Sequence, residues 1–279
     1  RARAARGSGQ RGSGGRVSAA NELPPLVVAP LLCAGGGPLL VHALRRYART
    51  VPAADAARGG WRAADVFLVA ASVLVALLAA PTWLRLDSMS AQLLASQAGF
   101  AVGGGLAFAL LRLRGRAPEA LGLVRPASQG AYSGALLGYA PLVLCWFGVL
   151  VAWGHLARFL GWPEEQEVLK LLLALEGREL FLCALIAIVV GPFLEELLFR
   201  GFLQGALGEL LGARPGALVS ALLFAVLHGL PGLPGLVLLS LFLTWLRAQS
   251  GSLFVPYLVH ALHNALTLGL ALALRGAMQ

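Results

Sequence analysis

The chain has 279 residues, of which 58% are hydrophobic and only 13% are charged. A soluble domain carries about 25% charged residues, so a single soluble globule is excluded because it could not cover its surface. Its 22 basic residues outnumber its 13 acidic ones, but most arginines lie in short segments between apolar runs, where they set orientation, and no compact basic domain points to nucleic acid.

The first 20 residues are rich in Arg, Gly and Ser and hold almost nothing to bury, so they are predicted to form a disordered basic tail. Eight apolar stretches follow. Each is predicted to be a helix, because the runs are continuous and backbone groups in lipid must be satisfied internally. The sequence therefore predicts an all-α polytopic membrane helix bundle with about eight transmembrane helices, in a multi-pass protein of the cell membrane. The stretches cover about residues 23–44, 65–84, 91–111, 131–157, 179–210, 213–229, 233–248 and 252–273.

Two connectors between the stretches are informative. Residues 112–130 are basic, and residues 158–178 place four glutamates around an amphipathic segment that is predicted to lie at the membrane interface. Arginine-rich loops after the first and third stretches are typical of cytoplasmic loops. With eight spans, however, the basic tail would lie on the opposite side, so the sidedness stays open.

Ionisable side chains inside the apolar stretches are concentrated in the last four. Such groups are costly in lipid and are functional candidates by default. Three others, near the ends of earlier stretches, are interpreted as interfacial: His42, Asp65 and His155. The candidates are Glu195, Glu196, Arg200, His228, His260 and His263, with the polar Asn264 beside them.

Glu195 and Glu196 lie in the segment GPFLEELLFRG, after a weak point at Gly191-Pro192. Glu196 and Arg200 are four residues apart, so they share a helix face and can pair. Glu195 is rotated about 100° from that face. The pairing leaves Glu195 free, and a free carboxylate in a low-dielectric site suits general base catalysis.

The histidines are predicted to reach the same region. Glu195 lies 17 residues before Gly212 and His228 lies 16 after it, so antiparallel helices joined there place the two side chains at similar depth. In the last stretch Asn264 follows His260 by four residues, and the histidine between them shares their side of the helix. Buried His and Asn can also serve as hydrogen-bond glue between helices, and Phe224 is interpreted as a packing residue.

Taken in order, these residues form the motifs EExxxR (Glu195–Arg200), FxxxH (Phe224–His228) and HxxxN (His260–Asn264). This set resembles that of the CPBP family, which comprises the CAAX prenyl protease type II and bacteriocin-processing membrane proteases and is also called Abi. The resemblance covers about residues 118–272, including LGLVRP at 121–126. It suggests three regions: the tail (1–20), variable transmembrane helices (21–117) and a protease core (118–279).

The resemblance also implies roles. Glu195 would activate the water that attacks a peptide carbonyl, assisted by His228. His260 and Asn264 would stabilise the oxyanion, for which an imidazole and an amide are suitable donors. Glu196 and Arg200 would hold the helix and tune the base, while the part played by His263 stays unassigned.

The need for a metal stays open at this point. Glu195, His228 and His260 could supply the three ligands of a catalytic site for a divalent metal such as zinc. The same residues suit a metal-free glutamate protease. The sequence has neither the HExxH motif nor the GxGD motif of other membrane-embedded proteases.

The predicted function is an intramembrane endopeptidase that hydrolyses a membrane-associated peptide or protein substrate, CAAX-like or a leader peptide, within membrane lipid. A non-enzymatic membrane scaffold or immunity-type protein is the alternative. A proton-coupled transporter could use the same buried Glu and His residues, but transporters usually show repeated halves, and here the candidate ionisable residues all lie in the second half.

Overall fold

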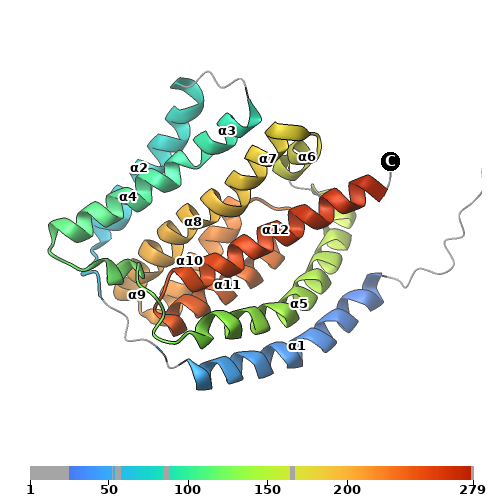
Figure 1. The fold of residues 1–279 in the computed structure, drawn as a ribbon, viewed down its shortest axis with the longest axis horizontal. Coiled ribbons are helices and arrows are strands. Elements are labelled where there is room, and N and C mark those ends of the chain that lie inside the picture. Colours follow the sequence, from blue (N-terminus) through green and yellow to red (C-terminus); the bar gives the residue numbers. More distant parts are fainter. Residues whose placement is uncertain (1–24, 52, 54–57, 84–87, 164–166, 278–279) are drawn as a thin grey trace, which may run out of the picture.

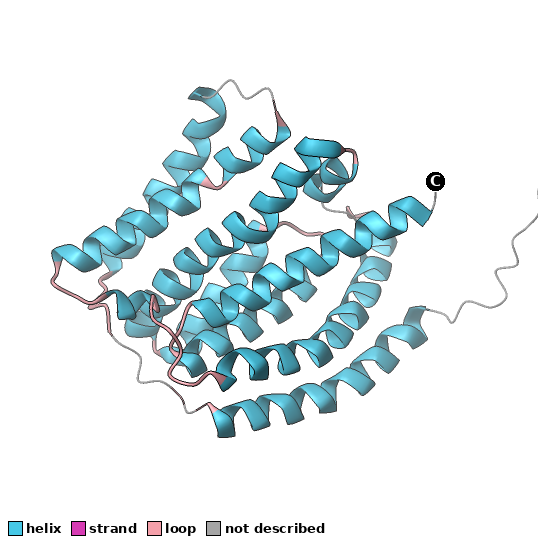
Figure 2. Ribbon diagram, in the orientation of Figure 1, coloured by secondary structure: helices cyan, strands magenta, loops and turns pink. Residues whose placement is uncertain are grey.

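The computed structural model describes residues 25–51, 53, 58–83, 88–163 and 167–277, and across these ranges it contains helices and loops but no strand (Figure 2). The predicted tail at 1–20 lies outside the described residues. The first half contains α1 (Pro25–Thr50), α2 (Ala63–Trp83), α3 (Met89–Ser96), α4 (Ala98–Leu113), the short η1 (Pro118–Leu121) and α5 (Gly130–Leu160). The second half contains α6 (Glu167–Leu173), α7 (Gly177–Leu185), η2 (Ile186–Val190), α8 (Gly191–Glu196), η3 (Leu197–Leu203), α9 (Gln204–Leu211), α10 (Ala213–Leu227), α11 (Leu233–Ser250) and α12 (Phe254–Ala277).

The prediction of a polytopic helical membrane bundle is confirmed. All eight apolar stretches are helical, and six helical segments among the described residues are long and apolar enough to cross a membrane. Two others, 63–79 and 213–227, are apolar but shorter. The structure therefore supports six candidate spans, and the expected count of eight is not confirmed.

The outer surface of the bundle carries large apolar side chains that a soluble protein would bury. Phe67 is 74% exposed, Leu78 66% and Phe159 86%. Exposed apolar area of this extent marks contact with lipid or a partner, and lipid accounts for its spread over α2 and α5. The chain is accordingly a multi-pass membrane protein.

The helices are arranged with the chain's last third at the centre. α1 lies along α5 on one side, and α2 packs with α4 on the other (Figure 1). Between these pairs run the segment from α7 to α9 and helices α10, α11 and α12. The central helices are thus shielded from both sides.

Small residues allow neighbouring helices to approach closely. A side-chain carbon added at Gly216 of α10 would lie 2.5 Å from the backbone nitrogen of Gly208 in α9. A carbon added at Gly104 of α4 would lie 2.8 Å from the side chain of Leu197. Close backbone approach through small residues is how membrane helices gain packing energy without a hydrophobic driving force.

The longest central segment, from Gly177 to Leu211, is a continuous helix that contains two π turns. In η2 the N–H of Gly191 donates to the carbonyl of Ile186, and in η3 the N–H of Gln204 donates to that of Phe199. Both bonds join residues five apart, whereas an α-helix joins residues four apart. The expected weak point at Gly191-Pro192 is therefore a π turn, and α8 is the short α-helical piece between two of them.

Candidate active site

The two adjacent glutamates lie at the end of α8, directly before η3. Both are buried, Glu196 completely and Glu195 at 8% exposure. The Nη1 of Arg200 donates to Oε1 of Glu196 at 2.9 Å, and both side chains are fully buried. The pairing predicted from the four-residue spacing is present, and within the described part of the chain Glu195 has no arginine partner.

Arg200 is held on its other side by α11 and α10. Its Nη2 donates to the hydroxyl of Ser240 at 2.7 Å, and its guanidinium carbon lies 4.3 Å from the centre of the Phe224 ring. A cation over an aromatic face is stabilised by the ring quadrupole, most strongly when water is absent. Arg200 therefore ties together three helical segments around one buried charge.

Glu195 faces two histidines from different helices. Its Oε2 lies 3.5 Å from Nε2 of His228, at the end of α10, and 3.7 Å from Nε2 of His260 in α12. Oε2 itself is buried and accepts no hydrogen bond among the described residues. A buried carboxylate oxygen without a donor is costly, and a proton or a water molecule there would satisfy it.

The two imidazoles are oriented by their other nitrogens. The Nδ1–H of His228 donates to the carbonyl of Phe224 at 2.7 Å. The Nδ1 of His260 lies 2.9 Å from Oε1 of Glu196, and a carboxylate that pairs with Arg200 can only accept, so the imidazole donates. Each ring consequently turns its Nε2 toward Glu195, because the partner of one imidazole nitrogen fixes the role of the other.

Asn264 bonds to a backbone carbonyl in the π turn η2 that has no backbone donor among the described residues. Its amide nitrogen donates to the carbonyl of Ala187 at 2.8 Å. The N–H of Gly191 is used by Ile186, and the next backbone nitrogen, that of Pro192, carries no hydrogen to donate. The side chain of Asn264 thus replaces a backbone donor that proline removes, and one of its two amide hydrogens stays available.

A cavity of about 350 Å³ lies beside these residues and is lined by His228, His260, His263 and Asn264. Apolar side chains from α5, α6 and α11 complete its wall, including those of Leu150, Leu169, Leu172, Leu236 and Leu239. Glu195 is not itself a lining residue, but it contacts the two lining histidines nearest to it. The cavity is therefore mostly apolar, with polar side chains on one part of its wall and the Glu195 carboxylate directly behind the two histidines there.

His263 occupies a different part of this wall. Its Nδ1 and the hydroxyl of Tyr139 lie 3.1 Å apart and share a hydrogen bond, and its ring meets that of Trp146 edge-on at 4.7 Å between centres. It is buried at 5% exposure. His263 therefore anchors α12 to α5 rather than facing Glu195.

Glu195, His228 and His260 are the candidate ligands for a metal ion. Glu195 approaches His228 and His260, yet within the described ranges no group of three or more His, Cys, Asp or Glu side chains is arranged to hold a metal ion. The arrangement found here does not fit a three-ligand centre, so no chemical step is assigned to one. Zinc ligation by these residues stays a prediction.

The structure brings five of the predicted site residues into one network of contacts: Glu195, Glu196, Arg200, His228 and His260. Asn264 lies on the same cavity but is bonded to η2. Sequence reasoning missed Ser240 and Tyr139, because a lone Ser or Tyr in an apolar run has no distinguishing spacing. It also treated Phe224 as packing, which is correct for the ring but overlooks the carbonyl that orients His228.

Comparison with known families agrees with the motifs. Residues 177–266 match the family model described as type II CAAX prenyl endopeptidase Rce1-like. No curated protein and no solved structure matches the chain. The matched region runs from the start of α7 into α12, so it contains every predicted site residue. The resemblance to the CPBP family is thereby confirmed for residues 177–266, the region that is similar to the Rce1-like type II CAAX prenyl endopeptidases.

Proposed function

We propose that this protein is an intramembrane endopeptidase in which Glu195 activates a water molecule for attack on a peptide carbonyl. The observation that carries the proposal is the position of Glu195 beside an apolar cavity. Its Oε2, which accepts no hydrogen bond among the described residues, faces His228 and His260. A carboxylate held close to the reacting water is a suitable general base. The Rce1-like match over 177–266 supports the same class of reaction.

The reaction begins with a water molecule that donates one hydrogen to Glu195 and is held by Nε2 of His228. That nitrogen accepts when His228 is neutral, because its Nδ1–H is already donated to Phe224. The water oxygen bonds to the carbonyl carbon as its proton passes to Glu195, and the carbonyl becomes an oxyanion. Glu195 then returns the proton to the amide nitrogen, the C–N bond breaks, and the products are a carboxylic acid and an amine.

The oxyanion requires donors on the other side of the reacting carbon. His260 supplies one when its Nε2 is protonated, because Glu196 already holds its Nδ1–H in place. The remaining amide hydrogen of Asn264 supplies a second. Preorganised donors of this kind contribute about 3 to 4 kcal/mol each to transition-state stabilisation. Glu196 and Arg200 act as positioning residues for His260.

The cavity indicates the kind of substrate. Its wall is mostly apolar, and exposed apolar helices surround the bundle. A peptide that is itself embedded in or attached to the membrane, such as a CAAX-like C-terminus or a leader peptide, would present its scissile bond from the lipid side. Within a cell the proposed place of action is the cell membrane.

The test is cleavage of a membrane-anchored fluorogenic peptide by the full chain in proteoliposomes. Glu195→Gln and His228→Ala are each expected to lower kcat by at least about 100-fold, the usual contribution of a general base or its partner. The matched control is Glu176→Gln, because this carboxylate is 83% exposed and pairs with Arg275 rather than with a residue of the network. The helical content and resistance to unfolding of each variant are measured in parallel.

Cleavage that survives in both Glu195→Gln and His228→Ala would overturn the proposal. Loss of cleavage in both, with normal activity in Glu176→Gln, supports it over a scaffold role. A chelator arm addresses the zinc hypothesis separately. Activity that is lost with chelator and restored by added zinc would show that the reaction depends on a metal.

A further inference from the structure

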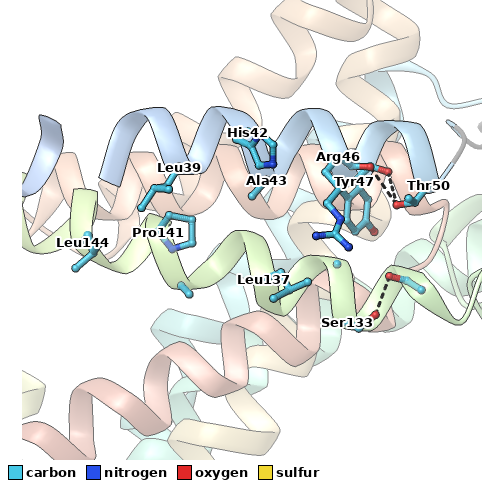
Figure 3. Close-up of a pocket in the computed structure, with 13 residues that line it drawn as sticks. Leu39, His42, Ala43, Arg46, Tyr47, Thr50, Ser133, Leu137, Pro141 and Leu144 are labelled. Carbon is cyan, nitrogen blue, oxygen red and sulfur yellow. Dashed lines mark hydrogen bonds between the residues drawn. The ribbon is translucent and has the colours of Figure 1, made fainter. Parts of the chain in front are cut away.

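A second cavity lies away from the candidate active site, between the C-terminal half of α1 and the first turns of α5. Its volume is about 570 Å³. Leu39, Leu144 and Pro141 line one end, and Arg46, Thr50 and Ser133 line the other. Figure 3 shows the Arg46 side chain extending from α1 toward α5 across the polar end. The cavity is therefore amphipathic along its length.

The dimensions of the cavity match one layer of a bilayer. Leu39 and Thr50 are separated by 11 residues of α1, which at about 1.5 Å per residue corresponds to about 16 Å. Half of a hydrocarbon core is about 15 Å thick. The polar end coincides with the C-terminus of α1 and the N-terminus of α5, where the helices leave the apolar layer. The cavity is thus about as long as one hydrocarbon layer of a bilayer is thick.

The polar end is electropositive. Arg45 and Arg49 flank Arg46 on the last turns of α1, and the lining contains neither Asp nor Glu. Among the described residues no carboxylate pairs with Arg46. The hydroxyls of Thr50 and Ser133 already donate their hydrogens to carbonyls of their own helices, Thr50 to Arg46 and Tyr47, and Ser133 to Gly130 (Figure 3). The guanidinium of Arg46 is consequently the cationic donor that a ligand would meet at this end.

We propose that this cavity binds one anionic phospholipid, with its phosphate on Arg46 and an acyl chain along Leu39, Pro141 and Leu144. An acyl chain fits the apolar end in length and chemistry, and a planar guanidinium recognises a phosphate with two parallel hydrogen bonds. The occupant joins α1 to α5, so α1 is held to the bundle through lipid as well as through protein contacts. The proposal is independent of the protease chemistry, since no residue of the candidate active site lines this cavity.

The test compares binding of phosphatidylglycerol and phosphatidylcholine with identical acyl chains to the purified full chain, by native mass spectrometry from detergent. The unaltered protein is expected to prefer phosphatidylglycerol by about fivefold, the effect of one arginine near an anionic headgroup. Arg46→Gln is expected to remove this preference. Arg49→Gln is the matched control, because it removes an equal charge less than one helical turn away, at a residue that does not line the cavity. It is expected to keep the preference.

A steric variant tests the acyl half. Ala140 lines the cavity and is exposed, so Ala140→Phe fills the space without entering the protein core. It is expected to weaken binding of both lipids while the helical content stays unchanged. Equal binding of the two lipids by the unaltered protein would overturn the proposal, as would an Arg49→Gln variant that loses as much preference as Arg46→Gln. Unchanged binding in Ala140→Phe would overturn the placement of the acyl chain.

Discussion

The buried pair of Glu196 and Arg200 allows a quantitative prediction about stability. Glu196→Gln leaves a fully buried guanidinium without its carboxylate, and breaking such a pair costs about 3 to 5 kcal/mol. Ser240 and the ring of Phe224 remain to stabilise the cation, so about 3 kcal/mol is expected, the low end of that range. Arg200→Met is expected to cost about 2 kcal/mol, because Glu196 keeps its bond to His260.

The double variant removes both charges together and is expected to cost only about 3 kcal/mol, so the pair couples by about 2 kcal/mol. The free energy of unfolding is measured by SDS titration of mixed micelles, followed by far-UV circular dichroism. A parallel cycle of Glu195→Gln with Arg200→Met is the control, because no hydrogen bond joins Glu195 to Arg200, and its coupling is expected to be smaller. Additivity of Glu196→Gln and Arg200→Met within about 0.5 kcal/mol would refute the argument that the pair acts as a unit.

Two further predictions follow from the packing and from the π turn. Gly216→Ala places a carbon 2.5 Å from backbone atoms of α9 and is expected to cost about 1 to 3 kcal/mol in the same unfolding assay. The control is Gly269→Ala, which has nothing within 4 Å of the added carbon and is expected to be neutral or stabilising by up to about 1 kcal/mol. Equal effects of the two substitutions on the free energy of unfolding would contradict the close approach of α9 and α10. Asn264→Leu removes the donor to the Ala187 carbonyl and is expected to cost about 1 to 3 kcal/mol of stability. It is also expected to lower kcat by at least about 100-fold. Loss of stability without loss of activity would show that Asn264 has a purely structural role.

The helices were largely predictable because membrane segments obey a strong constraint. Backbone groups in lipid must bond within their own segment, so each continuous apolar run is helical. The departures lie where local chemistry changes the geometry. The third stretch is divided at Gln97 into α3 and α4, and the stretch around Glu195 contains two π turns that a uniform helical period does not reveal.

The candidate site was predictable only to the extent that it depends on spacing along one helix or one hairpin. The Glu196–Arg200 pair follows from a four-residue separation, and the proximity of Glu195 and His228 follows from hairpin geometry about Gly212. The contact of His260 with Glu196 joins residues 64 apart. It depends on how α12 packs against α8, which no local pattern encodes.

Two other residues show which signals were overlooked. Asn264 was expected to serve the reaction, yet it also donates to the Ala187 carbonyl. The overlooked signal is Pro192, because a proline has no N–H and leaves a preceding backbone carbonyl without its helical donor. Asp65 lies in the first turn of α2, as its interfacial interpretation requires. It is nevertheless buried at 4% exposure, and Arg114 binds both its oxygens, a partner 49 residues away.

The two π turns on either side of α8 have a consequence for how this helix tolerates changes in length. A π turn accommodates one more residue than the α-helix it interrupts. A one-residue deletion within 186–190 or 197–203 therefore converts the turn to regular helix, and the flanking segments keep their orientation about the helix axis. A deletion within the six residues of α8 has no such reserve. It rotates the carboxylates by about 100° relative to the preceding helix, away from both imidazoles, so the short piece that carries the glutamates is the part of the helix whose length cannot vary.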